Sequence, residues 1–183
     1  MSNDLISVEP IEAQNKKTID TLKTLSRDLQ DKAIKSALRV SAKPLAEAMK
    51  CGAPGSPKTA GTSLAQAVNI SQAKSGARIR TGAGNRAVSL SSGEFGVIVG
   101  PNKKVGGESL GALAMLLEGG AKAHKISSKN NILKLGVRFL RGAVNHPGFR
   151  AKNWMTGAFD MSAPMIEQQF YTGLDKWIAR NGR

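Results

Sequence analysis

The spacing of hydrophobic residues changes twice along this chain, and this change constrains the fold more than any other feature. From Ile11 to about Ser41 apolar residues recur at the i, i+3 and i+4 spacing that is typical of an amphipathic helix. From Val68 to Val99 they alternate with polar neighbours, which indicates β-strands. After Asn153 the helical spacing returns. The sequence therefore predicts helices at both ends of the chain and strands between them.

Proline is predicted to interrupt both end helices. Pro44 has no backbone N–H, so we expect it to kink the first helix or to start a second short one. The last helix should begin at an Asn153 N-cap and break at Pro164, with Ser162 as the cap of its second part.

The middle of the chain is predicted to be largely extended. Four segments should form an antiparallel meander, near residues 68–70, 77–81, 88–90 and 95–99. A second extended region should form a hairpin from residues 123–126 and 132–144, with 127–131 at its tip. Two short helices should complete the set, one over 63–67 capped by Thr62 and one over 110–117. The expected class is α+β, a mostly antiparallel sheet flanked by a long N-terminal helix and a C-terminal helix.

The length of 183 residues fits one domain. We expect residues 1–10 to form a flexible N-terminal arm and residues 11–183 a single α+β domain. The first residues lack the charged and apolar regions of a signal peptide, and the apolar run Leu110–Leu117 is too short to span a bilayer. A single cysteine, Cys51, fits a reducing cytoplasm.

Positive charge is concentrated in the middle of the chain. The net charge is +14, and no Asp or Glu lies between Glu47 and Glu94 or between Glu118 and Asp160. Such a basic middle favours polyanions or acidic protein surfaces as partners, and a merely solvated basic surface is the alternative. Eight basic residues are the candidate contacts to a partner or to DNA: Arg78, Arg80, Lys103, Lys104, Lys122, Lys125, Arg138 and Arg141.

No motif in the sequence predicts a catalytic, cofactor or metal site. Gly107–Gly111 matches G-x-S-x-G, but the strand expected before it ends near Val99. That motif also needs an acid followed by a histidine later in the chain, whereas His124 and His146 both precede Asp160 and no acid lies between Glu118 and either histidine. The two histidines lack cysteine or carboxylate neighbours for a metal. Gly82–Ala87 mimics a dinucleotide fingerprint but lies between two predicted strands.

A turn at His146-Pro147-Gly148 is predicted to precede the last helix. Pro147 fixes its own φ and biases His146 towards extended geometry, while Gly148 permits a positive φ. The turn is therefore a candidate structural element within the second acid-free segment.

Three segments, taken in chain order, resemble the motifs of one protein family. The first is similar to "aP…TG.L..si" and comprises Ala53-Pro54, Thr59-Ala60-Gly61 and residues 64–68. The second resembles "vE.Gt..H.i" and comprises residues 116–126. The third resembles "L.f…HPG…pF…A" and comprises residues 133–139, His146-Pro147-Gly148-Phe149, Trp154-Met155 and Ala158. The family is the tail-completion, or neck, proteins of long-tailed double-stranded DNA bacteriophages, and the resemblance covers roughly residues 30 to 180.

The resemblance implies a structural, non-enzymatic virion protein of the tail and neck, without a cofactor, made in the host cytoplasm. It would complete the tail end and help to join it to the DNA-filled head. The implied partners are further copies of the chain, in a ring matching the six-fold tail, and head-closure, tail-terminator and tail-tube proteins. Non-specific contact with double-stranded DNA is compatible with this role, and no membrane is implied. The alternative is a basic, non-sequence-specific nucleic-acid-binding protein of the DNA-packaging or nucleoid type.

Overall fold

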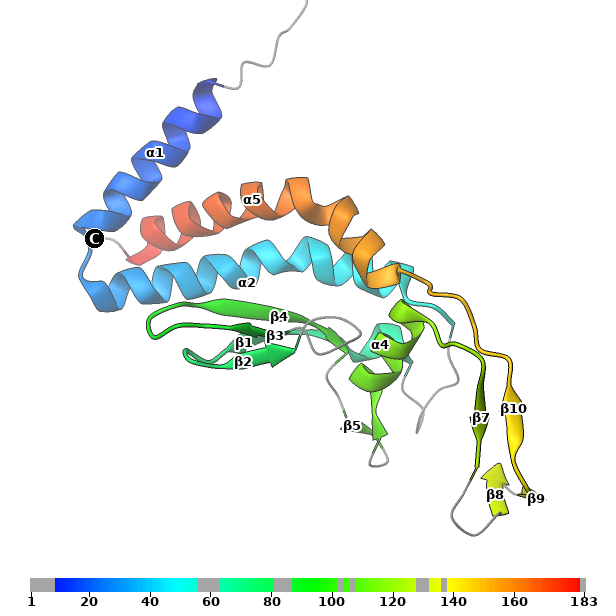
Figure 1. The fold of residues 1–183 in the computed structure, drawn as a ribbon. Helices are drawn as coiled ribbons and strands as arrows, with labels where there is room; N and C mark the ends of the chain where they lie inside the picture. The colour runs from blue at the N-terminus through cyan, green and yellow to red at the C-terminus, as the bar shows by residue number, and fades with distance from the viewer. Residues whose placement is uncertain are drawn as a thin grey trace, which may run out of the picture.

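Two long helices, α2 (Arg27–Gly52) and α5 (Trp154–Asn181), lie side by side and run in opposite directions along one side of the molecule (Figure 1). They are the helices that the periodic ends of the sequence predict. The structure is a computed structural model, and it describes residues 9–55, 63–80, 87–101, 104–105, 108–127, 132–135 and 138–181.

The N-terminal helical region breaks earlier than the sequence predicts. Helix α1 (Glu9–Thr24) ends before an extended Ser26, and α2 then continues through Pro44 to Gly52. The side-chain amide of Gln30 donates to the Leu25 carbonyl at 2.8 Å, which satisfies one of the carbonyls at the break. Pro44 removes one backbone hydrogen bond, but neighbouring residues Ala42 and Ala46 are buried, and this packing outweighs the local loss.

The predicted break at Pro164 is also wrong, because α5 continues through it. Ser162 is fully buried and donates to the Ala158 carbonyl at 2.8 Å, so it does not cap a new helix. The carbonyl that Pro164 leaves without a donor belongs to Asp160, which is exposed to water.

Small residues allow α2 and α5 to approach closely. Ala33 and Ala37 on α2 are buried against Leu174, with Phe170 and Trp177 packed around them. A Cβ atom built on Gly173 would lie 3.0 Å from the Ala37 Cα atom. A second cluster of buried residues joins the other ends of both helices to the short helices and strands: Ala46, Met49, Leu64, Ala67, Val68, Leu110, Ala114, Trp154 and Ala158.

The first set of strands forms a nested pair of ladders and not a meander. Strand β1 (Val68–Ala73) pairs antiparallel with β4 (Gly96–Pro101), and β2 (Arg78–Arg80) pairs antiparallel with β3 (Ala87–Ser89). The strand positions therefore match the prediction, but the predicted pairing of neighbours is wrong. Val68 is buried in the cluster beneath α2, and Ile70 and its ladder partner Val99 pack against it. This burial favours β1 and β4 as partners.

Two short helices lead into and out of this region. Helix α3 (Leu64–Ala67) is capped by Ser63, whose hydroxyl and the Gln66 side chain form a capping box. The predicted cap, Thr62, lies outside the described residues. Helix α4 (Leu110–Gly119) follows the short pair β5 (Lys104–Val105) and β6 (Glu108–Ser109).

The second set of strands forms a projecting arm. Strand β7 (His124–Ile126) pairs antiparallel with β10 (Val144–His146), and β8 (Ile132–Leu135) pairs antiparallel with β9 (Arg138–Arg141). The predicted pairing is therefore wrong for residues 132–135, which pair with β9 and not with residues 123–126, and most of the predicted tip at 127–131 lies outside the described residues. We call residues 124–146 the arm. Figure 1 shows it extending away from the helices.

The predicted mixture of antiparallel strands with long helices at both ends of the chain is confirmed. The predicted single sheet enclosed by these helices is wrong, because the described strands form separate two-stranded ladders, the two long helices pack on each other, and helices make up most of the described residues. The predicted division into a 1–10 arm and one domain stays a prediction.

The two glycines of α5 provide a test of the close helix contact. A Cβ on Gly157 meets no atom within 4 Å, so Gly157→Ala should stabilise the protein by about 0.5–1 kcal/mol. Gly173→Ala should instead destabilise it by about 1 kcal/mol, because overpacking against Ala37 outweighs the gain in helix propensity. Thermal and urea unfolding of both variants would measure the difference. Equal stabilisation by both changes would contradict the tight contact.

Candidate functional site

A buried glutamate joins the end of α4 to the start of α5. Glu118 is only 8% exposed, and one carboxylate oxygen accepts from the Met155 N–H at 2.7 Å. The other oxygen accepts from the Thr156 N–H at 3.0 Å and from the Thr156 hydroxyl at 2.6 Å. These are the N–H groups that the first turn of a helix leaves without intrahelical partners. Glu118 therefore caps α5 from a distant part of the chain.

The same hydrogen bonds set the acidity of Glu118. Burial raises the pKa of the carboxyl, but the hydrogen bonds from the Thr156 hydroxyl and from the backbone of Met155, Thr156 and Trp154 lower it by more. The pKa is therefore below the ordinary glutamate value. The positive end of the α5 dipole favours the same ionised state.

Two backbone segments cross directly beside this cap. Ala121 and Phe149 exchange hydrogen bonds, with N–O distances of 2.9 Å from Ala121 and 2.8 Å from Phe149. At this crossing Gly148 has φ +78, and a Cβ atom there would lie 2.3 Å from the Ala121 carbonyl oxygen. Gly120 has φ +70, and its Cβ would lie 2.6 Å from the Ala151 nitrogen. Only glycine fits both the conformation and the space.

The two histidines meet at the root of the arm. They face each other across β7 and β10, and their rings stack with centroids 5.0 Å apart. The Gly148 N–H donates to His146 Nδ1 at 3.0 Å, whereas His124 Nδ1 lies 2.8 Å from the Lys122 carbonyl oxygen and must donate to it. Neutral rings with the proton on opposite nitrogens satisfy both contacts.

We call this set of contacts the junction, comprising residues 117–124 and 146–156. It brings together two of the motifs that carry the family resemblance, the glutamate segment and the His-Pro-Gly segment. The predicted helix start at Asn153 is confirmed, because α5 begins at Trp154 and the Asn153 carbonyl accepts from the Gly157 N–H at 2.9 Å. Asn153 has φ +48, and the first-turn N–H groups of Met155 and Thr156 are bound by Glu118. The only sign of the capping role of Glu118 in the sequence was a single carboxylate at the end of an apolar helix. No nearby residue indicated that it would bind the first turn of α5.

The eight candidate basic contacts fall on different parts of the fold. Lys122 lies at the root of the arm, Lys125 in β7, Arg138 in β9 and Arg141 at the end of β9. The Lys122, Lys125 and Arg141 side chains are exposed. The remaining four are not brought to the arm by its strand pairing: Arg78 and Arg80 lie in β2, Lys104 lies in β5, and Lys103 lies outside the described residues. Their contacts to partners or DNA stay predictions.

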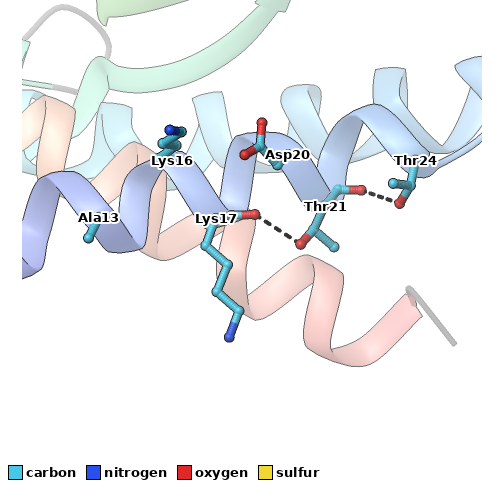
Figure 2. A pocket seen from close by; sticks show the side chains of 6 residues that line it. All are labelled: Ala13, Lys16, Lys17, Asp20, Thr21 and Thr24. Atoms are coloured by element: carbon cyan, nitrogen blue, oxygen red, sulfur yellow. Dashed lines mark hydrogen bonds between the residues drawn. The ribbon is translucent and has the colours of Figure 1, made fainter.

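The described residues offer little that resembles an active site. A shallow hollow is lined by residues of α1 alone, among them Lys17, Asp20 and Thr21 (Figure 2). The Thr21 and Thr24 hydroxyls there donate to backbone carbonyls of their own helix. This hollow gathers no nucleophile and base. Within the described ranges, no group of three or more His, Cys, Asp and Glu residues could hold a metal.

One sequence argument about the G-x-S-x-G segment needs correction. The structure places β6 at Glu108–Ser109 directly before α4, so a short strand does precede the helix there. Glu118 does lie between Ser109 and the two histidines in the chain, but its carboxylate binds the first turn of α5, and both histidines belong to the junction. Among the helices described, none is long and apolar enough to cross a membrane.

The fold and the junction define a small mixed helix–strand protein with a basic arm held at its root by a buried carboxylate. Residues 16–127 match the model of the HK97-gp10-like family, described as the bacteriophage HK97 gp10 tail component. The match spans more than half of the chain, which therefore belongs to this family.

The chain is thus a phage tail component and a structural protein of the virion, as the resemblance predicts. The matched range includes Glu118 and β7, whereas the His-Pro-Gly segment lies beyond it. No curated protein and no solved structure matches the chain significantly.

The Glu118 cap should make the stability depend on pH. Because folding lowers the pKa of this carboxyl, its contribution is present above the unfolded value of about 4.3 and is lost as the pH falls through the folded pKa. Glu118→Gln should lower the free energy of unfolding by about 1–3 kcal/mol at neutral pH, and by less in acid. Urea unfolding between neutral and acid pH would measure this, with the exposed Glu167→Gln as control. Parallel curves for the wild type and Glu118→Gln would contradict the ionised cap.

Two glycines with similar backbone angles separate conformational strain from crowding. Gly93 has φ +88 in open space, so Gly93→Ala should cost about 1 kcal/mol from the backbone alone. Gly148→Ala should cost several kcal/mol more, because its Cβ would overlap the Ala121 carbonyl. Chemical denaturation gives both values. Similar losses for the two variants would show that the chains do not cross closely at Gly148.

Proposed function

We propose that this tail component completes the end of the phage tail and helps to join it to the DNA-filled head, as a homo-oligomeric ring matching the six-fold tail. The family match supports a place in the tail. The observation that most supports a joining role is the arm, which projects from the body (Figure 1) and carries exposed basic residues.

A ring is the assembly that suits such a molecule. The arm ladders are two-stranded, and isolated two-stranded ladders are marginally stable in water. Their outer edges leave backbone groups that another chain can cover. A projecting element that binds a different surface on the next copy forms a heterologous contact, and such contacts close into rings. Oligomer formation would also add buried area to a core built largely from alanine.

The basic residues are proposed to contact acidic surfaces of neighbouring head-closure, tail-terminator and tail-tube proteins, and to a smaller extent DNA. A channel that passes DNA gains nothing from gripping phosphates, since each neutralised phosphate adds salt-dependent affinity. Charge complementarity between proteins instead sets register and association rate. In this role the protein positions other components and performs no catalysis.

The proposal is tested by phage that lack this gene, complemented from a plasmid. Without the protein we expect filled heads and separate tails to accumulate, and purified protein added to that lysate should restore joined, infectious particles. Electron microscopy and plaque titre measure the two effects. Normal particles without the protein would contradict a joining role.

The same particles address the alternative, a DNA-packaging or nucleoid-type protein. A tail-end component should remain with purified tails in high salt, whereas a protein held by phosphates should elute, because its affinity falls steeply with salt. Recovery of the protein only with DNA, and release by salt, would favour the alternative.

A further inference from the structure

The arm exposes apolar side chains where a monomer would be expected to bury them. Ile126 and Val144 face each other across β7 and β10, and both are exposed. Phe139 on β9 is 66% exposed. Among the described residues, neither ladder of the arm pairs with a third strand. Exposed apolar side chains grouped on one element are typical of a protein–protein contact.

The charge of the arm restricts what can cover it. Lys125 and Arg141 are exposed, and no acidic residue lies between Glu118 and Asp160. No ion pair to either side chain is found among the described residues. A partner for this surface should therefore combine apolar side chains with carboxylates.

The N-terminal half of α5 has that combination. Phe159, Met161 and Met165 are exposed, Met161 to 77%. Asp160 and Glu167 lie among them, are exposed, and pair with no cation in the described part of the chain. From Trp154 to Asp175 the helix contains no lysine or arginine, although the net charge of the chain is +14. These five side chains spread over more than half of the helix circumference at about 3.6 residues per turn, and we call this exposed stretch of the helix the α5 face: Phe159, Asp160, Met161, Met165 and Glu167.

We propose that the arm of one protomer docks on the α5 face of the next copy of this chain. The inference rests on the proposed ring and identifies its two contacting surfaces. Both surfaces belong to every copy, so each protomer can offer its arm to one neighbour and its α5 face to the other. Such a head-to-tail contact is the heterologous kind that generates rings.

The geometry favours a neighbouring copy over the same molecule. The backbone crossing of Ala121 with Phe149 fixes the root of the arm beside the start of α5. From this root the arm points away from the helices (Figure 1). The strands of the arm therefore lie where a neighbouring copy can meet them, away from the α5 face of their own molecule (Figure 1).

Charge reversal on each surface tests the contact. Lys125→Glu with Arg141→Glu, and separately Asp160→Lys with Glu167→Lys, should each lower the yield of joined, infectious particles about tenfold or more, because like charges then meet. All four changes in one chain restore opposite charges at every interface, so the yield should recover. Lys32→Glu with Lys43→Glu, two exposed lysines of α2, is the matched control and should have little effect. Complementation of the gene-deficient phage measures the yields, and circular dichroism checks that each variant is folded.

Crosslinking gives a second measurement that does not depend on yield. The exposed Cys51 is first replaced by serine. Val144→Cys and Met161→Cys are then introduced together, and purified tails are treated with a thiol-reactive bifunctional crosslinker. Because each copy contributes both cysteines, we expect a ladder of multimers of this chain, whereas either cysteine alone should give none beyond a dimer.

The outcomes separate this inference from the proposed function. Failure of the fourfold reversal to recover, or crosslinks only to a different tail protein, would overturn the docking of arm on α5. So would the absence of a ladder from tails that contain the protein and join normally, and in that case the proposed function would stand. If the protein is missing from tails, or its deletion leaves joining intact, the proposed function fails as well.

Discussion

The Glu118 carboxylate is the contact on which the arrangement of the other elements depends. It lies at the end of α4 and binds the first turn of α5, so one charged group fixes the angle between two helices. A buried charge is costly unless its lone pairs are satisfied, and here both oxygens accept hydrogen bonds. The crossing of Ala121 with Phe149 lies next to this cap. The direction of the arm is thereby tied to the position of α5.

The close packing of small residues has a consequence beyond the helix pair. Ala33, Ala37 and Gly173 bring α2 and α5 together without large side chains between them. The exposed side of α5 then carries Phe159, Met161 and Met165, which the pair itself does not cover. A body that holds its helices tightly and leaves apolar groups outside is suited to assembly, because little has to rearrange when a neighbour binds.

The spacing of apolar residues predicted which segments are helices and which are strands. It failed where contacts between residues far apart in the sequence determine where a helix ends or which strands pair. Pro44 lies inside a continuous helix because buried neighbours compensate for one lost hydrogen bond, and Pro164 because the carbonyl that it leaves without a donor belongs to the exposed Asp160. Sequence spacing shows neither the burial nor the exposure. The predicted meander was wrong because packing beneath α2 determines that β1 pairs with β4. The Glu118 cap spans 37 residues, so no local pattern could reveal it, although the family motif contained the residue. The partner contacts of the basic residues stay predictions.

The distribution of charge bears on how copies of such a chain avoid unproductive contacts. A net charge of +14 makes identical copies repel one another at distances within the screening length of the solution. At short range Asp160 and Glu167 provide carboxylates in a stretch of α5 that has no basic residue, so in the proposed contact an approaching arm meets attraction there without competing repulsion from that stretch. Repulsion between the basic surfaces of two copies then disfavours incorrect registers, while the complementary charges of the contact select one register. In the proposed contact, the acid-free segment and the base-free stretch from Trp154 to Asp175 would complement each other from the two sides, a role that neither has in an isolated monomer.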